Sequence, residues 1–96
     1  MGYYVILHIC YLPLADDPRV DAIVDDIFST DPGDRFSKYC GMVRCGGSQS
    51  PEESIAPEME QLREVLGSSF DDISLTLYEP RDLSASDFSE LLPPEP

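Results

Sequence analysis

The side chains in this sequence best suited to metal binding or nucleophilic chemistry belong to His8, Cys10, Cys40 and Cys45. One imidazole and three thiols would be enough for a tetrahedral zinc site. The spacing opposes such a site, because Cys40 and Cys45 are an odd number of residues apart and would point to opposite faces of one regular strand. A Cys–His catalytic pair needs an exposed, activated thiolate, whereas His8 lies in an apolar stretch. We therefore expect no cofactor and no enzymatic activity, with a small metal-binding or redox protein as one alternative.

The sequence also lacks the common motifs of catalysis, namely a glycine-rich phosphate loop, GxSxG and HExxH. Three cysteines in a short chain without a recognisable leader sequence indicate reduced thiols, so we expect the cytoplasm. No apolar run approaches the ~18 residues needed to cross a bilayer, so we expect no membrane association.

Negative charge is the dominant property of the composition. The chain has 19 Asp and Glu residues against six Lys and Arg, which gives a formal net charge of −13. This charge repels polyanions, so it excludes nucleic acid as a direct ligand and favours a basic protein surface as the partner. It also exceeds the magnitude of ~2–8 that suits the solubility of a small domain. An acidic surface without a partner is the alternative interpretation.

Some carboxylates have a role in the helices themselves, and others do not. Asp17 suits an N-cap position, whereas Asp21 and Asp25 are one helical turn apart and repel each other. Such carboxylates lie ~6 Å apart, similar to the phosphates of an extended strand, and an arginine fork accepts either group. Tyr78 is a candidate aromatic anchor on the wet face of a strand. The candidate partner-binding residues are therefore Asp21, Asp25, Asp26, Asp31, Asp34, Glu60, Glu64 and Tyr78.

Hydrophobic periodicity predicts the elements that must position these residues. The stretch 3–11 is a strand that is apolar on both faces, and 36–45 is a second strand. Between them, Asp17 and Pro18 begin a helix whose apolar stripe runs from Val20 to Phe28. Gly41 in the second strand indicates a bulge or a close backbone approach.

The second half of the chain repeats the alternation. Ser50 and Glu53 form a capping box for a second helix, Pro57 predicts a kink or restart, and Gly67 ends the helix. A third strand follows over 73–78, with alternating apolar residues. A short helix over 86–92 is expected before an extended tail.

The predicted order is β-α-β-α-β followed by a short helix. This order favours an α/β fold, a small two-layer sandwich with a three-stranded sheet joined by parallel crossovers. An α+β arrangement with an antiparallel second strand is the alternative. We expect one compact domain over residues 1–92 and a tail over 93–96.

Size, acidity, a lone domain and the lack of catalytic motifs together resemble the DNA-mimic inhibitors of phages and mobile elements. Anti-CRISPR proteins, restriction inhibitors and the inhibitor of uracil-DNA glycosylase are of this type. The resemblance is compositional and covers the whole chain. It implies a stoichiometric inhibitor, most specifically an anti-CRISPR protein that blocks target-DNA binding by a CRISPR effector complex. An immunity protein or antitoxin that neutralises a basic toxin enzyme is the alternative.

Overall fold

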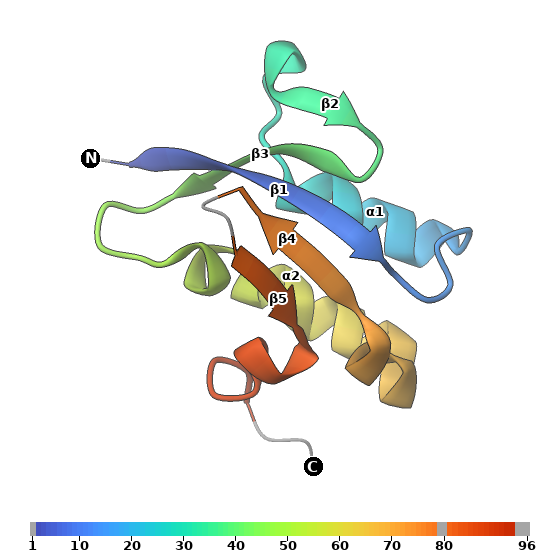
Figure 1. Ribbon diagram of the computed structural model, residues 1–96. Coiled ribbons are helices and arrows are strands. Elements are labelled where there is room, and N and C mark those ends of the chain that lie inside the picture. The colour runs from blue at the N-terminus through green and yellow to red at the C-terminus, as the bar shows by residue number, and fades with distance from the viewer. Residues whose placement is uncertain (1, 79–80, 94–96) are drawn as a thin grey trace.

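The computed structural model describes residues 2–78 and 81–93 of the chain, which form one sheet and a helical layer (Figure 1). The strands are β1 (Tyr3–Tyr11), β2 (Arg35–Ser37), β3 (Cys40–Cys45), β4 (Ser74–Leu77) and β5 (Arg81–Ser84). The α-helices are α1 (Pro18–Ile27) and α2 (Pro51–Leu66). Three short 3-10 segments are η1 (Pro32–Asp34), η2 (Gly67–Asp72) and η3 (Ala85–Phe88).

The sheet has the strand order β2-β3-β1-β4-β5, and every neighbouring pair is antiparallel. Helix α2 connects β3 to β4, which lie on either side of β1. The segment from β1 to β4 therefore has the split β-α-β topology of ferredoxin-like sandwiches, with β5 added at one edge. The expected mixture of helices and strands in a small sandwich is confirmed. The expected three-stranded sheet is wrong, since the sheet has five strands.

The two additional strands arise where the sequence pattern did not show a turn or a strand. The expected strand over 36–45 is interrupted by a turn at Lys38 and Tyr39, which folds it into the β2–β3 hairpin. At the other end of the chain, Leu83 pairs with Leu75 and is buried, so 81–84 joins the sheet. The helix expected over 86–92 is reduced to the short segment η3.

The hydrophobic core lies between the sheet and the helical layer. Leu7 and Ile9 of β1 point toward the helices and are buried, whereas their neighbours in sequence point the other way. The apolar stripe predicted for α1 is confirmed, because Val20, Ile23, Val24, Ile27 and Phe28 are all buried. Both helices lie on one side of the sheet, behind it in Figure 1. The opposite face of the sheet carries no helix among the described residues.

Two glycines and one proline affect where these elements end and how closely they pack. A Cβ on Gly41 would lie 2.9 Å from the carbonyl oxygen of Asp34 and 3.1 Å from Phe28 Cδ1, so the predicted close approach is confirmed. Gly67 ends α2 with a φ of +59°, a conformation that favours glycine. Helix α2 continues through Pro57, contrary to the expected restart. The expected tail lies mostly outside the described residues.

Candidate protein-binding surfaces

Two of the predicted binding carboxylates have basic partners within the chain. Lys38 Nζ lies 3.0 Å from Asp21 Oδ1, and Arg35 Nη2 lies 3.0 Å from Asp25 Oδ1. Both cations belong to the β2–β3 hairpin, which passes beside α1. The hydrogen bond with Asp21 raises the pKa of Lys38. Asp21 and Asp25 therefore help to attach the hairpin to the helix, a role that the sequence pattern did not reveal.

Arg35 makes most of this attachment. Its guanidinium donates to the carbonyl oxygens of Ser37 at 2.8 Å and Lys38 at 2.7 Å, in addition to Asp25. It also lies over the ring of Phe28, 4.6 Å from the ring centroid. One planar cation thus joins the turn, the helix and an aromatic ring of the core.

The third aspartate of α1 points in a different direction. Asp26 lies toward α2, where its negative charge acts on the carboxyl group of Glu58. Burial and, to a smaller degree, this charge raise the pKa of Glu58. Glu58 Oε2 is inaccessible to solvent and has no hydrogen-bond partner among the described residues. The partly buried Glu58 and the exposed Asp26 therefore repel each other, and Glu58 was not among the predicted site residues.

The outer side of α2 is acidic in a regular way. Glu53, Glu60 and Glu64 recur at i, i+7 and i+11, which places them in one stripe. The stripe lies away from the buried side chains of Met59 and Leu62. The carboxylates of Glu60 and Glu64 have no ion pair with any described residue. We call the outward carboxylates of the two helices the helical acidic face: Asp25, Asp26, Glu53, Glu60 and Glu64.

The remaining predicted residues lie elsewhere. Asp31 precedes η1 and Asp34 is its last residue, so both lie just before the β2–β3 hairpin, and Asp31 is exposed. Tyr78 follows β4 and is 59% exposed. Its backbone N–H donates to the carbonyl oxygen of Ile6, so Tyr78 lies beside β1 on the sheet. The eight predicted residues therefore do not form one site.

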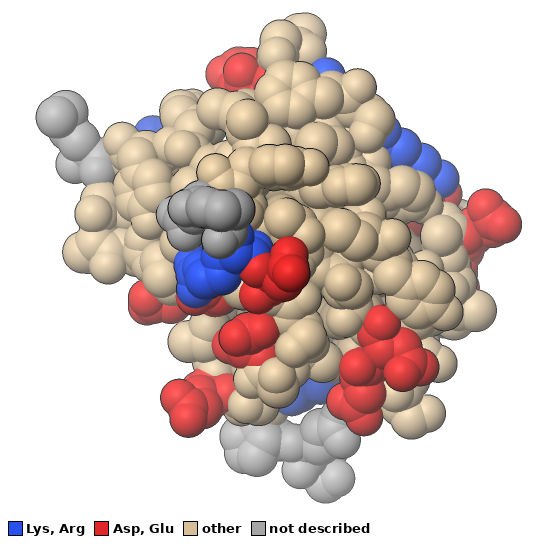
Figure 2. Space-filling view, viewed as in Figure 1, with Lys and Arg blue, Asp and Glu red and all other residues tan. Residues whose placement is uncertain are grey.

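The uncovered face of the sheet differs sharply from the helices in its charge. Asp82 is the only carboxylate in the described strands, and the other acidic residues that the structure describes belong to helices, 3-10 segments and loops. Figure 2 shows this face with uncharged residues over β1, β3 and β4, and with charged groups at β5 and around the outline. The chain therefore separates its negative charge from one broad surface.

A row of polar side chains crosses the uncovered face. Cys10 Sγ lies 3.9 Å from His8 Nδ1 and 3.3 Å from Thr76 Oγ1. The Thr76 hydroxyl in turn donates to Asp82 Oδ1 at 2.9 Å. The three cysteines are free, and within residues 2–78 and 81–93 no group of three or more His, Cys, Asp or Glu side chains could hold a metal ion. This row supplies no metal site.

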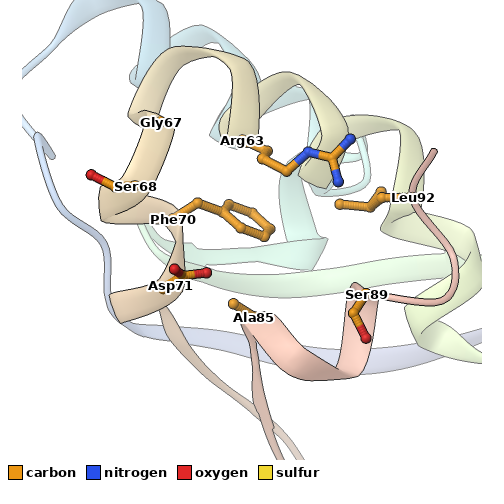
Figure 3. A pocket seen from close by; sticks show the side chains of 8 residues that line it. All are labelled: Arg63, Gly67, Ser68, Phe70, Asp71, Ala85, Ser89 and Leu92. Carbon is orange, nitrogen blue, oxygen red and sulfur yellow. The ribbon is translucent and has the colours of Figure 1, made fainter. Parts of the chain in front are cut away.

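The surface of the described residues contains pockets, of which two are well formed. The larger is a cavity of about 400 Å³ between α2, η2 and η3, with an apolar wall of Phe70, Ala85 and Leu92 (Figure 3). At its rim the guanidinium of Arg63 donates to the carbonyl oxygen of Pro93 at 2.6 Å. Its lining contains no imidazole or thiol that could serve as a base or nucleophile. The smaller pocket lies at the end of β1 and is mostly apolar.

The helix caps confirm the sequence prediction at both main helices. Asp17 Oδ1 accepts from the backbone N–H of Arg19 at 2.8 Å, and the Arg19 guanidinium donates to Asp17 Oδ2 at 2.7 Å. These hydrogen bonds hold the pKa of Asp17 below its ordinary value. Ser50 and Glu53 make the reciprocal capping box of α2. These acids therefore have a structural function.

Comparison with known proteins identifies no relative. No protein-family model matches the chain, and neither a curated protein nor a solved structure matches it. None of the described helices has the length and apolar character needed to span a membrane.

Proposed function

We propose that this protein is a non-enzymatic inhibitor that binds a basic, nucleic-acid-binding site on another protein. The observation that carries the proposal is the placement of charge. The excess of acids lies outside the sheet, and the helical acidic face includes carboxylates that form no ion pair with a described residue, namely Asp26, Glu60 and Glu64. A long-range negative field of this kind steers a positively charged partner toward the helices.

A nucleic-acid site is the basic surface that suits these carboxylates best. Its lysines and arginines are already arranged for phosphates, and an arginine accepts carboxylate oxygens with the same fork. Along α2, Glu60 and Glu64 are one turn apart, which gives the ~6 Å repeat of a charged backbone. The most specific form of the proposal is an anti-CRISPR protein that blocks target-DNA binding by an effector complex in the cytoplasm.

The ion pairs within the chain assign a smaller role to Asp21 and Asp25. Each already faces a cation of the β2–β3 hairpin, so a partner must compete with Lys38 or Arg35. Asp25 is still 68% exposed, and exposed pairs contribute only about 0–1 kcal/mol. Asp26, Glu60 and Glu64 are therefore the better residues for a test.

The test is a DNA-binding assay with a purified CRISPR effector complex. We expect the native chain to block target-DNA binding at a stoichiometric ratio and to be displaced by excess DNA. The triple variant Asp26→Lys, Glu60→Lys and Glu64→Lys should inhibit at least about tenfold more weakly, because it reverses the charges facing the partner.

A matched control changes the net charge equally in another region. The variant Asp71→Lys, Asp72→Lys and Glu90→Lys alters exposed acids near η2 and η3 and should retain inhibition within about threefold. Equal losses in the two variants would reject the helical acidic face as the site. Binding that DNA cannot displace would instead support an immunity protein or antitoxin.

A further inference from the structure

Cys10 differs from the other two cysteines in its access to solvent. Cys10 is exposed, whereas Cys40 is half-buried and Cys45 is buried. All three thiols are free. Cys10 belongs to the row of polar side chains on the face of the sheet that carries no helix among the described residues. Because a thiol reacts only where a reagent can reach it, Cys10 is the cysteine most accessible to a reagent in solution.

Two side chains that can stabilise an ionised thiol lie next to Cys10. His8 Nδ1 lies 3.9 Å from Cys10 Sγ, so the imidazole is placed to accept the thiol proton. Thr76 Oγ1 lies 3.3 Å from the same sulfur. The Thr76 hydroxyl donates to Asp82 at 2.9 Å, and a rotation about its C–O bond turns the same hydrogen toward Sγ. Transfer of the proton to His8 therefore leaves a sulfur with two donors beside it, an imidazolium and a hydroxyl.

A pocket of about 310 Å³ at the end of β1 gives room for a group attached to this thiol. Cys10 is one of its lining residues, and the lining is mostly apolar. Tyr39 fixes one wall, because its carbonyl oxygen accepts from the backbone N–H of Ile9 at 2.8 Å and its hydroxyl donates to the carbonyl oxygen of Ala15 at 3.1 Å. The pocket is therefore held by contacts that do not involve the thiol. Its volume is at the lower end of the range of about 300–1,000 Å³ of small-molecule sites.

We propose that Cys10 is a site of covalent modification by small, positively charged disulfides through thiol–disulfide exchange. His8 takes the thiol proton, and Cys10 Sγ attacks one sulfur of the disulfide. A new S–S bond forms at Cys10 as the original S–S bond breaks, and the other half leaves with the bonding electrons and takes the proton from His8. The sulfur of Cys10 is oxidised and the leaving sulfur is reduced, so the disulfide is the only oxidant needed. This inference does not depend on the proposed inhibitory function.

The charge of the chain selects among disulfides. The net charge of −13 and the Asp82 carboxylate beside Thr76 attract a cationic disulfide and repel an anionic one. Cystamine, the disulfide of a small amine, should therefore react at least about tenfold faster than oxidised glutathione, which is anionic. Each rate is first divided by the rate of 2-mercaptoethanol with the same disulfide, which removes the difference in intrinsic reactivity. Added salt should reduce the preference, since it screens the charges.

Mass spectrometry of the digested chain after timed exposure to cystamine tests the site. We expect one cysteamine group on Cys10, attached at least about tenfold faster than on Cys40 or Cys45. His8→Ala should slow the reaction of Cys10 at least about fivefold, because it removes the proton acceptor. Thr76→Val should slow it about twofold, because it removes a donor to the ionised sulfur. Thr76→Ser keeps the hydroxyl and is the control, which should react at the native rate.

The same rates in about 8 M urea separate the arrangement in the folded chain from the chemistry of the residues. The three thiols should then react at similar rates, and His8→Ala should have no effect. Circular dichroism in buffer shows whether each variant is folded. A native Cys10 that reacts no faster than Cys40 would overturn the proposal, as would a folded His8→Ala chain that reacts at the native rate. If His8→Ala does not fold, equal rates in Thr76→Val and Thr76→Ser would overturn it. A chain with no preference for cystamine would reject the cationic class of disulfide.

Discussion

At the residue scale, the carboxyl group of Glu58 lies in an environment that disfavours its charged form. It lies at the contact of the two helices, where burial and the nearby Asp26 both raise its pKa. Since the folded-state pKa lies above the unfolded one, the folded chain holds this proton more tightly. The stability of the fold therefore falls as the pH rises through the folded pKa of Glu58.

The variant Glu58→Gln should consequently be more stable than the native chain at pH 7, by some tenths of a kcal/mol. The gain should vanish as the pH falls below 4.5, the ordinary pKa of this group, because Glu58 is then protonated in both states. Urea denaturation at a series of pH values measures both effects. Glu64→Gln is the control, because Glu64 is exposed on the same helix. A stability loss in Glu58→Gln at pH 7 would contradict the assignment.

At this scale the sequence predicted the interactions between residues that are close along the chain. It did not predict the contacts between residues that are far apart along the chain. The signals that begin and end a helix depend on neighbours only a few residues away. They are the N-cap Asp17 of α1, the capping box of Ser50 and Glu53 in α2, and Gly67 at the end of α2. The Asp21–Lys38 pair depends on a hairpin that passes beside α1. No local sequence pattern predicts this approach of the hairpin, so the sequence indicated no ion pair for Asp21 or Asp25.

At the element scale, the β2–β3 hairpin depends on one arginine. Removal of the side chain in Arg35→Ala deletes the hydrogen bonds to Asp25, Ser37 and Lys38 and the contact with the Phe28 ring. We expect a loss of about 1–2 kcal/mol in the free energy of unfolding, together with faster amide hydrogen exchange in β2. Chemical denaturation and hydrogen exchange measure these two quantities.

Arg44→Ala is the matched control for this prediction. Arg44 lies on β3 and is exposed, and it makes no ion pair within the described part of the chain. Its removal should change the stability by no more than about 0.5 kcal/mol. Arg35→Lys should recover little, because a lysine cannot reproduce the planar fork. Equal stability losses in Arg35→Ala and Arg44→Ala would show that the hairpin is held in another way.

The same hairpin explains why the strand count was underestimated. Residues 36–45 have a continuous strand-like composition, and the turn at Lys38 and Tyr39 contains no glycine, proline or asparagine to indicate it. The four residues of β5 become a strand mainly because Leu83 is buried beside Leu75. Tertiary packing, which a single sequence does not display, decided both elements.

At the scale of the whole molecule, charge and apolar surface are placed on opposite sides. The helical layer carries acids on its outer side, whereas Asp82 is the only carboxylate in the described strands. The sequence predicted the amount of charge, but the separation required the sheet order, which brings β1, β3 and β4 together.

The net charge should also control the stability of the fold. Repulsion among carboxylates destabilises a folded chain with a net charge of −13. Screening of this repulsion by salt should therefore raise the midpoint temperature of thermal unfolding. Between about 10 mM and 500 mM sodium chloride we expect an increase of about 4–8 °C, which corresponds to ~1 kcal/mol for a domain of this size. Scanning calorimetry measures this increase.

The variant Asp26→Asn, Glu60→Gln and Glu64→Gln is the control, because it removes charge from the helical acidic face without removing bulk. It should be more stable than the native chain at low salt and should gain less from added salt, whereas its binding to a basic partner should weaken. Salt thus acts in opposite directions on the two properties: it stabilises the fold and weakens the attraction to a cationic partner. A midpoint that stays constant or falls with salt would show that the acids do not repel one another strongly enough to matter for folding.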